Sequence, residues 1–309
     1  MNCKELYQSK LTTAMEAVTH IPSNCRVVTA HAAGEPTHIV DAMVENYLQY
    51  ENVEVVHLLS LGNAGYVRPE MKGHIHHNAI FVGGNTRDAV FEGRADFTPA
   101  FFYTVPKMFH SELPVDVAII QISPPDESGN CSYGISCDFT KPAAEVANLV
   151  IAQVNDQMPR IGGDNYINIS DIDYLVEYST PMLELPAPKI GEVELAIGKN
   201  CAQLIEDGST LQLGIGAIPD AVLMSLKDKK DLGIHSEMFS DGVVDLYHAG
   251  VINNSKKVLH PGKMIVTFLM GSKKLYDFVD QNEDVELYSV DYVNNPLIIM
   301  KNNNMVAIN

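Results

Sequence analysis

The sequence predicts an α/β protein with parallel open sheets, and three observations support this class. In the first half of the chain, apolar segments of strand length alternate with segments of helix length, a pattern typical of strands joined by crossover helices. Glycine-containing turns stand where such strands lead into helices, as at 31–36 and 214–216. With 309 residues, of which 46% are hydrophobic and 19% charged, the chain has ample core for two domains or one large one.

The first half is predicted to begin with a helix at 5–18. The elements expected after it are a strand at 26–29, a helix at 39–47, and strands at 53–58, 79–82, 117–122 and 149–154. Strands that alternate with helices at this spacing pair in parallel and carry helices on both faces. We therefore expect a three-layer α/β domain.

A proline-rich segment, STPMLELPAPKIGE at 179–192, separates the two halves. Its residues Pro181, Pro186 and Pro188 cannot lie inside regular elements, so the segment is predicted to be a linker. We place the two domains at 1–187 and 188–309.

The second half shows the same kind of pattern. The expected elements are a helix at 193–205, a strand at 211–213, a helix at 219–227, and strands at 232–235, 264–269, 285–289, 297–300 and 305–308. The last strand ends with the chain, which would leave an exposed sheet edge. We therefore expect the second domain to be incomplete.

Charge and composition exclude several classes of protein. The formal net charge of −18 argues against nucleic acid or an anionic membrane surface as a partner. No apolar run approaches the length of a membrane span, and the first ten residues lack a signal core, so a cytoplasmic location is expected. Five cysteines without CxxC spacing indicate reduced thiols, in preference to disulfides or a zinc site.

Glu237 is the leading candidate for chemistry. The predicted strand 232–235 ends at Ser236-Glu237, and open α/β sheets bind ligands at the carboxyl ends of their strands. The glycine turn 214–216 allows close approach of a ligand, and the helix start after it offers free N–H groups. The alternative is a solvated loop glutamate. In a crevice, the carboxylate would suit a general base, a metal ligand or a nucleophile, and periodicity cannot choose among these.

Several segments together resemble one family. They are AMEAVTHI at 14–21, SPPDESG at 123–129, AQVNDQMPR at 152–160, QLGIGAIPDAV at 212–222, GIHSEM at 233–238 and LYDFVDQNEDVELYSVDYVNNP at 275–296. Spread over the whole chain, they are similar to the 4-hydroxybutyrate CoA-transferases of the acetyl-CoA hydrolase/transferase family (family I CoA transferases). The resemblance implies two open-sheet domains of the NagB/RpiA-like type and an enzyme that moves CoA between a short acyl-CoA and a small carboxylate.

The resemblance also implies a role for Glu237, which aligns with the glutamate of the family's HSEM or HTEM motif. As a nucleophile it would carry CoA as a glutamyl-CoA thioester in ping-pong exchange, with 4-hydroxybutyrate and acetyl-CoA or butyryl-CoA as substrates and without a metal. The family's QLGIGA loop implies CoA contacts at Gln212, Gly214, Ile215, Gly216 and Ala217. By itself, a lone GxG is commonly only a tight turn.

A mixed anhydride at Glu237 would have to be kept from water while the carboxylate stays ionised. We expect hydrogen-bond donors around it from Ser236 and from the N–H groups of 214–217. An anionic CoA also needs local positive charge in so acidic a chain. The candidates, each with a solvated turn as the alternative, are Lys227, Lys229, Lys230, Lys256, Lys257, Lys273 and Lys274.

A substrate pocket in the first domain is likewise implied by the family's HxxxEP segment. His31 would donate a hydrogen bond to a substrate carboxylate or hydroxyl, and the alternative is a structural histidine. Glu35 would cap the helix that follows. Ser123 and Pro124 end an apolar strand, where they would line the acyl pocket or only fix the loop, with Asn85 beside them.

The histidines of GHIHHN, His74, His76 and His77, lack the acidic or histidine partner of a metal site, so we interpret them as a solvated loop. A nicotinamide dehydrogenase is disfavoured because GIGAIP lacks the third glycine of GxGxxG. An acyl-CoA hydrolase stays open as an alternative, because it would need only water as the acceptor.

Relatives carry a later glycine-rich GVGGQ-type loop that is absent from this sequence. The resemblance therefore implies a C-terminally truncated member, and a non-catalytic CoA-binding fragment is a third hypothesis. Association as a homodimer or a larger homo-oligomer is expected from the family.

Overall fold

The computed structural model describes residues 2–308 and divides the chain into two compact units. Unit 1 comprises Met1–Arg160 and Tyr166–Leu183, and unit 2 comprises Ile161–Asn165 and Glu184–Asn309. The short segment 161–165 belongs to unit 2 because it pairs with a strand there. The sequence analysis did not predict that the chain enters unit 2 at 161–165 before it returns to unit 1. The domain boundary near residue 187 stays a prediction.

Seven parallel strands form the sheet of unit 1, in the order β10-β7-β5-β1-β2-β3-β4. They are β1 (Arg26–Thr29), β2 (Val53–His57), β3 (Ile75–Ala79), β4 (Ala95–Phe97), β5 (Val117–Ile122), β7 (Leu149–Val154) and β10 (Tyr174–Glu177). The chain builds the sheet outward from β1 in one direction and then, from β5, in the other. In such doubly wound sheets, ligands bind at the carboxyl edge where the order reverses, here between β1 and β5.

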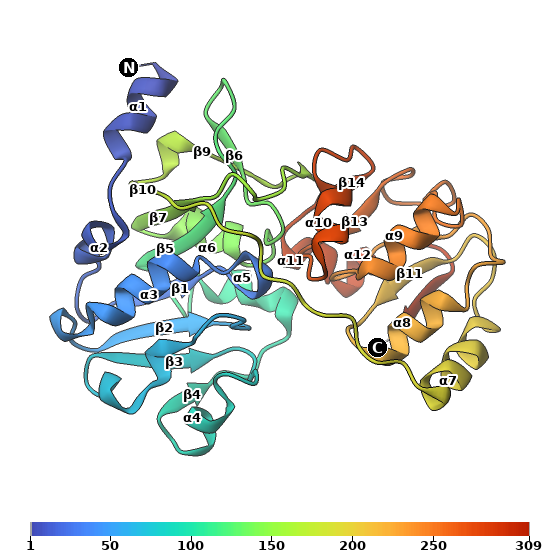
Figure 1. Cartoon of the computed structure of the whole chain (residues 1–309), viewed down its shortest axis with the longest axis horizontal. Coiled ribbons are helices and arrows are strands. Elements are labelled where there is room, and N and C mark those ends of the chain that lie inside the picture. Colours follow the sequence, from blue (N-terminus) through green and yellow to red (C-terminus); the bar gives the residue numbers. More distant parts are fainter. Residues whose placement is uncertain (1, 309) are drawn as a thin grey trace. The chain divides into compact units, whose positions relative to one another are not determined.

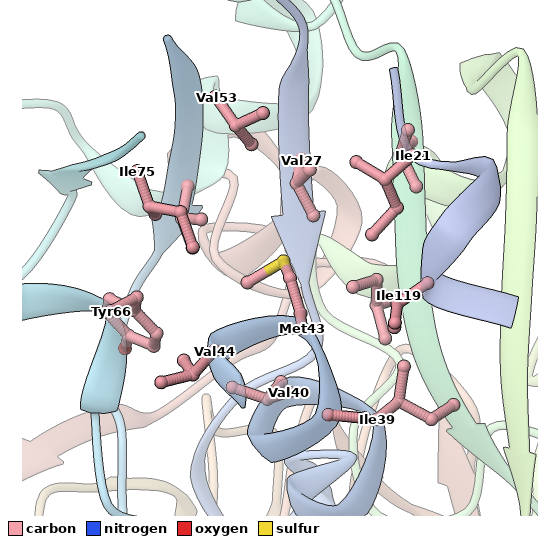
Figure 2. Close-up of a cluster of buried hydrophobic side chains, with 14 of the residues drawn as sticks. Ile21, Val27, Ile39, Val40, Met43, Val44, Val53, Tyr66, Ile75 and Ile119 are labelled. Atoms are coloured by element: carbon pink, nitrogen blue, oxygen red, sulfur yellow. The ribbon is translucent and has the colours of Figure 1, made fainter. Parts of the chain in front are cut away.

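Both faces of this sheet are buried. Val117 and Ile119 of β5 belong to one hydrophobic cluster, whereas Ala118 and Ile120 belong to another, because successive strand residues point to opposite faces. Helices α2 (Ala14–Ala17) and α3 (Thr37–Glu45) cover the first face. Figure 2 shows this cluster, in which side chains of the sheet meet those of α3 and its neighbours: Ile21, Val27, Ile39, Val40, Met43, Val44, Val53, Tyr66, Ile75 and Ile119.

The second face is covered by other elements of unit 1. They are α1 (Cys3–Lys10), α6 (Thr140–Val146) and the antiparallel pair β6 (Asn130–Ser132) and β9 (Tyr166–Asn168). Unit 1 therefore has the three layers that the alternation of strands and helices predicts.

Unit 2 contains two parallel three-stranded sheets, β12-β11-β15 and β13-β14-β8. Their strands are β8 (Gly162–Gly163), β11 (Thr210–Leu213), β12 (Gly233–Ile234), β13 (Met264–Val266), β14 (Val285–Leu287) and β15 (Met305–Ile308). A parallel bridge between His235 and Ile265 continues the pairing from β12 to β13. β8 lies so close to β14 that a Cβ at Gly163, whose φ is 93°, would be 2.4 Å from the carbonyl oxygen of Leu287.

The helices of unit 2 lie along these strands (Figure 1). They are α7 (Glu192–Ala202), α8 (Ala217–Met224), α9 (Asp241–His248), α10 (Lys273–Val279), α11 (Val290–Val293) and α12 (Pro296–Ile299). Two open parallel α/β units agree with the predicted fold class.

Three predicted elements were wrong. The strand expected at 79–82 is β3 at Ile75–Ala79, whose buried His77 and Asn78 conceal it in a hydrophobicity pattern. The strand expected at 297–300 is the helix α12, because the Asn295 side chain accepts from the N–H of Leu297 and Pro296 opens the first turn. The helix expected at 5–18 is interrupted where Leu11 pairs with Leu175.

Two further properties follow from the described residues. No disulfide joins Cys3, Cys25, Cys131, Cys137 and Cys201, all of which lie within the described residues, and their reduced state stays a prediction. Over residues 2–308, no helix has both the length and the apolar character needed to cross a bilayer, and α7, with 11 residues, is the longest.

Candidate active site

Glu237 follows β12 and is held by the neighbouring strand. Its carbonyl accepts hydrogen bonds from the N–H groups of Thr267 at 3.0 Å and Phe268 at 3.2 Å. Its side chain is half-buried, and Oε2 accepts a hydrogen bond from Nδ2 of Asn294 at 2.5 Å. The backbone and one carboxylate oxygen are thus both fixed, and the fixing donor is a neutral amide.

Asn294 is the site residue that the sequence analysis missed. It directly follows α11, and the carbonyl of Val293 before it accepts a hydrogen bond from Nε2 of His235 at 2.9 Å. Burial lowers the pKa of His235 to about 4, so its ring is neutral at pH 7 and carries its hydrogen on Nε2. His235 and Glu237 leave the same strand end, so β12 positions both the carboxylate and its donor. The sequence hint was the polar pair Asn294-Asn295 before a helix-starting proline.

Ser236 does not have the role expected for it. Its side chain is buried, and Oγ accepts from the N–H of Leu213 at 2.9 Å and donates to the carbonyl of Met238 at 2.6 Å. These bonds fasten the end of β12 to β11. The expected donor to Glu237 is therefore replaced by Asn294, and Ser236 holds the backbone on either side of the carboxylate.

The glycine turn lies one strand away, between β11 and α8. Gly216 has a φ of 124°, and a Cβ there would meet no heavy atom within 4 Å, so this position is open. Gly214 instead prolongs β11 by donating its N–H to the carbonyl of Ile308 at 2.7 Å. In this turn the positive φ therefore occurs at Gly216 and not at Gly214. Among residues 2–308, no acceptor binds the N–H groups of Ala217 and Ile218 at the start of α8.

A cavity of about 180 Å³ adjoins this turn. Ile215 and Gly216 line it together with Met238, the residue after Glu237, and the rest of its wall is made by Leu185, Pro186, Ala187, Pro188, Asp220, Ser240, Asp241, Met270 and Gly271. Burial raises the pKa of Asp220, although Ser240 Oγ donates to its carboxylate at 2.6 Å. Two of the five predicted CoA-binding residues thus line the same cavity as Met238, the residue that follows the candidate nucleophile. Gln212, which is half-buried, donates to the carbonyl of Leu213 at 3.3 Å.

His31 lies at the carboxyl end of β1, beside the switch point of the unit 1 sheet. It is fully buried, and its Nε2 is 3.1 Å from Oδ2 of Asp138, which is also fully buried. The turn it begins is tight: Ala32 has a φ of 53°, and a Cβ at Gly34 would be 2.5 Å from Cβ of Ser136. This is the environment of the structural histidine that the sequence analysis left open.

Glu35 and Asn85 are brought together by the loop after β2. The Glu35 carboxylate accepts from the N–H groups of Leu61 and Gly62, each at 2.9 Å, and Asn85 Nδ2 donates to the carbonyl of Gly62 at 2.7 Å. The predicted capping of α3 by Glu35 is wrong, since Pro36 is the N-cap and no side chain bonds there. Glu35 is 2% exposed, and this burial raises its pKa.

Ser123 and Pro124 follow β5 on the other side of the switch point. Ser123 is buried, and its Oγ accepts from the N–H of Ser132 at 2.9 Å. The carbonyl of Pro124 accepts from Arg160 Nη1 at 3.3 Å, and Arg160 Nη2 lies 2.8 Å from Asp126. These contacts favour the alternative in which this segment fixes the loop.

The expected lysines divide into several groups. Lys257 is buried, and its Nζ donates to the carbonyls of Ile234 and Lys263, so it is unavailable to a CoA phosphate and that assignment was wrong. Lys273 pairs with Asp277, and Lys274 with Asp245. For the other four lysines, a contact with CoA stays a prediction: Lys227, Lys229, Lys230 and Lys256.

The histidines of 74–77 do not form the solvated loop that we expected. His76 and His77 lie in β3; His77 is buried, which lowers its pKa to about 4, and His76 pairs with Asp96 at 2.8 Å. Within the described part of the chain, no cluster of three or more His, Cys, Asp or Glu residues is arranged to hold a metal ion.

Comparisons with known proteins agree on one family. The acetyl-CoA hydrolase/transferase N-terminal domain matches residues 1–184, and the corresponding C-terminal domain matches residues 271–309. The 4-hydroxybutyrate coenzyme A transferase of Clostridium kluyveri is 64% identical over 310 residues, covering 100% of this chain and 72% of that protein. A crystal structure of 4-hydroxybutyrate CoA-transferase from Porphyromonas gingivalis superposes with a TM-score of 0.90 at 46% identity, covering 99% of this chain and 74% of the other.

A more distant relative is an acetyl-CoA hydrolase of Yarrowia lipolytica. It is 25% identical over 272 residues, which cover 71% of this chain and 50% of that protein. The hydrolase names thus appear at lower identity than the transferase names.

Proposed function

The chain belongs to the acetyl-CoA hydrolase/transferase family, and from this premise we propose that it is a CoA-transferase. It exchanges CoA between a short-chain acyl-CoA and a small carboxylate. The proposed acid is 4-hydroxybutyrate, with acetyl-CoA or butyryl-CoA as the partner, because the relative that is 64% identical bears that acid in its name. CoA is thus a substrate in this proposal, carried by acyl-CoA.

Exchange of CoA between two carboxylates requires that the thioester's free energy be kept. In the proposed reaction, a carboxylate oxygen of Glu237 bonds to the acyl carbonyl carbon, and the carbon–sulfur bond breaks to release CoA thiolate. The thiolate then attacks the glutamyl carbonyl of the mixed anhydride, which releases the first acid and leaves glutamyl-CoA. The second carboxylate repeats these steps in reverse, so Glu237 is regenerated and no net proton is moved.

Asn294 supports this role because it donates to Glu237 without being able to transfer a proton. Its amide, 2.5 Å from Oε2, orients the carboxylate before attack. A preorganised donor at the same place also stabilises the negative charge that develops on the glutamyl oxygen when the thiolate attacks. The contact Asn294–Glu237 is the single observation that carries the proposal.

The cavity beside Gly216 is proposed to receive part of CoA. Asp220 and Asp241 line it, and carboxylates repel phosphate, so it suits the uncharged pantetheine arm better than the diphosphate. The open backbone at Gly216 and the N–H groups that start α8 supply donors next to it.

The carboxyl edge of the unit 1 sheet is proposed as the surface for the acid substrate. His31, Glu35, Asn85 and Ser123 support its turns through hydrogen bonds or buried contacts. We therefore propose that they shape this surface, and that substrate contacts come from the backbone and neighbouring groups of the same turns.

Trapping the covalent form tests the nucleophile. The whole protein is incubated with acetyl-CoA in the absence of a second acid, and its mass is measured. Addition of one CoA moiety is expected for the native protein and for the surface variant Glu206→Gln, and no addition for Glu237→Gln. CoA addition to Glu237→Gln at the native level would assign the intermediate to another residue.

Thiol release with and without an acceptor acid tests the hydrolase alternative. Release that depends on added carboxylate is the expected result. Equal release in its absence would make water the main acceptor. Association as a homodimer or a larger homo-oligomer stays a prediction, and so does the separate hypothesis of a non-catalytic CoA-binding fragment.

A further inference from the structure

A second cavity lies in unit 1, at the amino-terminal edge of its sheet. Its volume is about 560 Å³, within the range of roughly 300–1,000 Å³ typical of small-molecule pockets. It is bounded by Asn52 before β2, by the segment 66–76 that leads into β3, and by the turn 92–94 that leads into β4.

This cavity lies at the opposite edge from the candidate substrate surface of unit 1. All strands of the sheet are parallel, so residues that precede β2, β3 and β4 lie at one edge, and residues that follow β1 and β5, such as His31 and Ser123, lie at the other. A five-residue strand separates the edges by roughly 15 Å. A ligand held here would therefore not occupy the candidate substrate surface.

The charged residues that line the cavity are mostly positive, whereas the net charge of the protein is negative. The chain has 39 Asp and Glu residues against 21 Lys and Arg, yet three cationic side chains and one carboxylate line this cavity: Arg68, Lys72, Arg94 and Glu92. In a concave site, such an excess of one sign concentrates the field and attracts ions of the opposite sign.

One of the three cations is already used by the fold. Arg94 pairs with Glu92, its Nη2 lying 2.7 Å from Oε2, and donates through Nη1 to the carbonyl of Val67. It therefore ties the turn before β4 to the segment before β3, and its charge is largely balanced by Glu92.

The other two cations are available. Among residues 2–308, the side chains of Arg68 and Lys72 have neither an ion pair nor a hydrogen-bond acceptor, and both residues are exposed. Gly73, next to Lys72, has a φ of 86°, and a Cβ there would meet nothing within 4 Å. Two unpaired cations and an open backbone position thus line one cavity.

We propose that this cavity binds a small molecule with two or more phosphate groups, through Arg68 and Lys72. The planar guanidinium of Arg68 matches phosphate oxygens in pairs, and Lys72 adds a mobile charge beside it. A single carboxylate would leave one of the two cations unmatched, whereas adjacent phosphates engage both. The site rests on residues that the proposed transfer reaction does not use.

Binding of ADP and of inorganic diphosphate, measured by calorimetry, tests the site. The double variant Arg68→Ala/Lys72→Ala removes both unpaired cations, and Arg87→Ala/Lys107→Ala removes the same charge from exposed positions outside the cavity. The expected result is binding that weakens at least about tenfold in the first variant and stays near the native value in the second. The first variant should fold, since the side chains of Arg68 and Lys72 make no hydrogen bond within residues 2–308, and circular dichroism checks the folding of both variants.

The proposal is overturned if the native protein binds neither probe, or if both double variants weaken binding equally. A parallel titration with CoA identifies the source of the phosphates. Loss of CoA affinity in Arg68→Ala/Lys72→Ala would mean that the nucleotide end of the substrate occupies the cavity, and loss for ADP alone would mean a separate effector. Glu237→Gln should bind ADP normally, so failure of the transfer mechanism leaves this test intact.

Discussion

Glu35 and Glu237 are two carboxylates at strand ends with different surroundings. Glu35 in unit 1 is 2% exposed, and its carboxylate accepts from the N–H groups of Leu61 and Gly62 and from Ser60 Oγ. Glu237 in unit 2 is half-buried, and a side-chain amide from Asn294 bonds to its carboxylate. Backbone donors tie Glu35 to the folding of a loop, whereas Glu237 is bonded by a side-chain amide and is followed by Met238, which lines a cavity.

The difference shows why position in the chain does not identify a reactive group. Both glutamates follow a strand and stand near a glycine turn. Only the partners of the carboxylate distinguish a residue that holds the fold from one suited to attack a substrate. Substitutions at the two sites should therefore separate stability from activity.

The largest effect is expected from Glu237→Gln. Loss of the proposed nucleophile should lower the rate of CoA exchange by roughly a thousandfold or more, because a glutamine amide cannot form the glutamyl-CoA thioester. The midpoint of thermal unfolding should change little. Steady-state exchange assays with Glu206→Gln as the control measure this, and retention of a tenth of the native rate by Glu237→Gln would contradict the comparison.

Glu35→Ala should have the opposite effect. Two half-buried N–H groups and the buried hydroxyl of Ser60 would lose their acceptor, which should lower the free energy of unfolding by about 2–4 kcal/mol. Denaturant unfolding measures this loss, with the exposed Glu45→Ala as a matched control. If Glu35→Ala proves as stable as its control, the loop 60–62 does not depend on this carboxylate.

Asn294→Ala tests whether the amide that bonds to Glu237 contributes to catalysis. Removing one preorganised donor should lower kcat by roughly 10- to 100-fold, since a single donor of this kind contributes a few kcal/mol to the transition state. Asn303→Ala, an exposed asparagine near the end of the chain, serves as the control. An unchanged kcat would show that Asn294 only packs against the carboxylate.

The smallest effect concerns the pH dependence that His235 contributes. Its pKa is about 4 in the folded chain against an ordinary 6.5, so the unfolded chain binds the proton more readily and stability falls as the pH drops from 6.5 towards 4. His235→Gln keeps a donor near the Val293 carbonyl but removes the titration. The loss of unfolding free energy between pH 7 and pH 4.5 should shrink by roughly 2–2.5 kcal/mol.

The exposed His248→Gln is the control for this measurement. The same pH dependence in His235→Gln as in the native protein would mean that this histidine does not sense acid from its buried place. The other buried histidines contribute equally to both proteins, so the difference between the two curves isolates His235.

Parts of the fold were predictable because local pattern is enough for them. β1, β5 and β7 have the predicted bounds, since each is an apolar run bounded by polar or turn residues. β8 was missed, because two glycines carry no strand signal and pair only through the close approach of β14. The helix α12 was mistaken for a strand because its cap and proline outweigh its apolar residues.

The residues of the candidate site also fall into those that local sequence predicts and those that depend on distant contacts. Glu237 was found because it follows a strand, a feature that is local in the chain. Asn294 lies 57 residues further along and reaches Glu237 only when α11 docks at the end of β12. Likewise, Ser236 is held by β11 and Glu35 by the loop after β2, and no short segment reveals these contacts.

The sequence alone thus determined the class of fold, the family and the position of the proposed nucleophile, because hydrophobic period, turn residues and motifs are properties of neighbouring residues. The tertiary structure decided which polar side chains support the backbone and which face a ligand, including the amide that orients Glu237 and the unpaired cations of the second cavity. The physical reason is that hydrogen-bond partners and burial are set by residues distant in the chain, and they come together only when the sheets form.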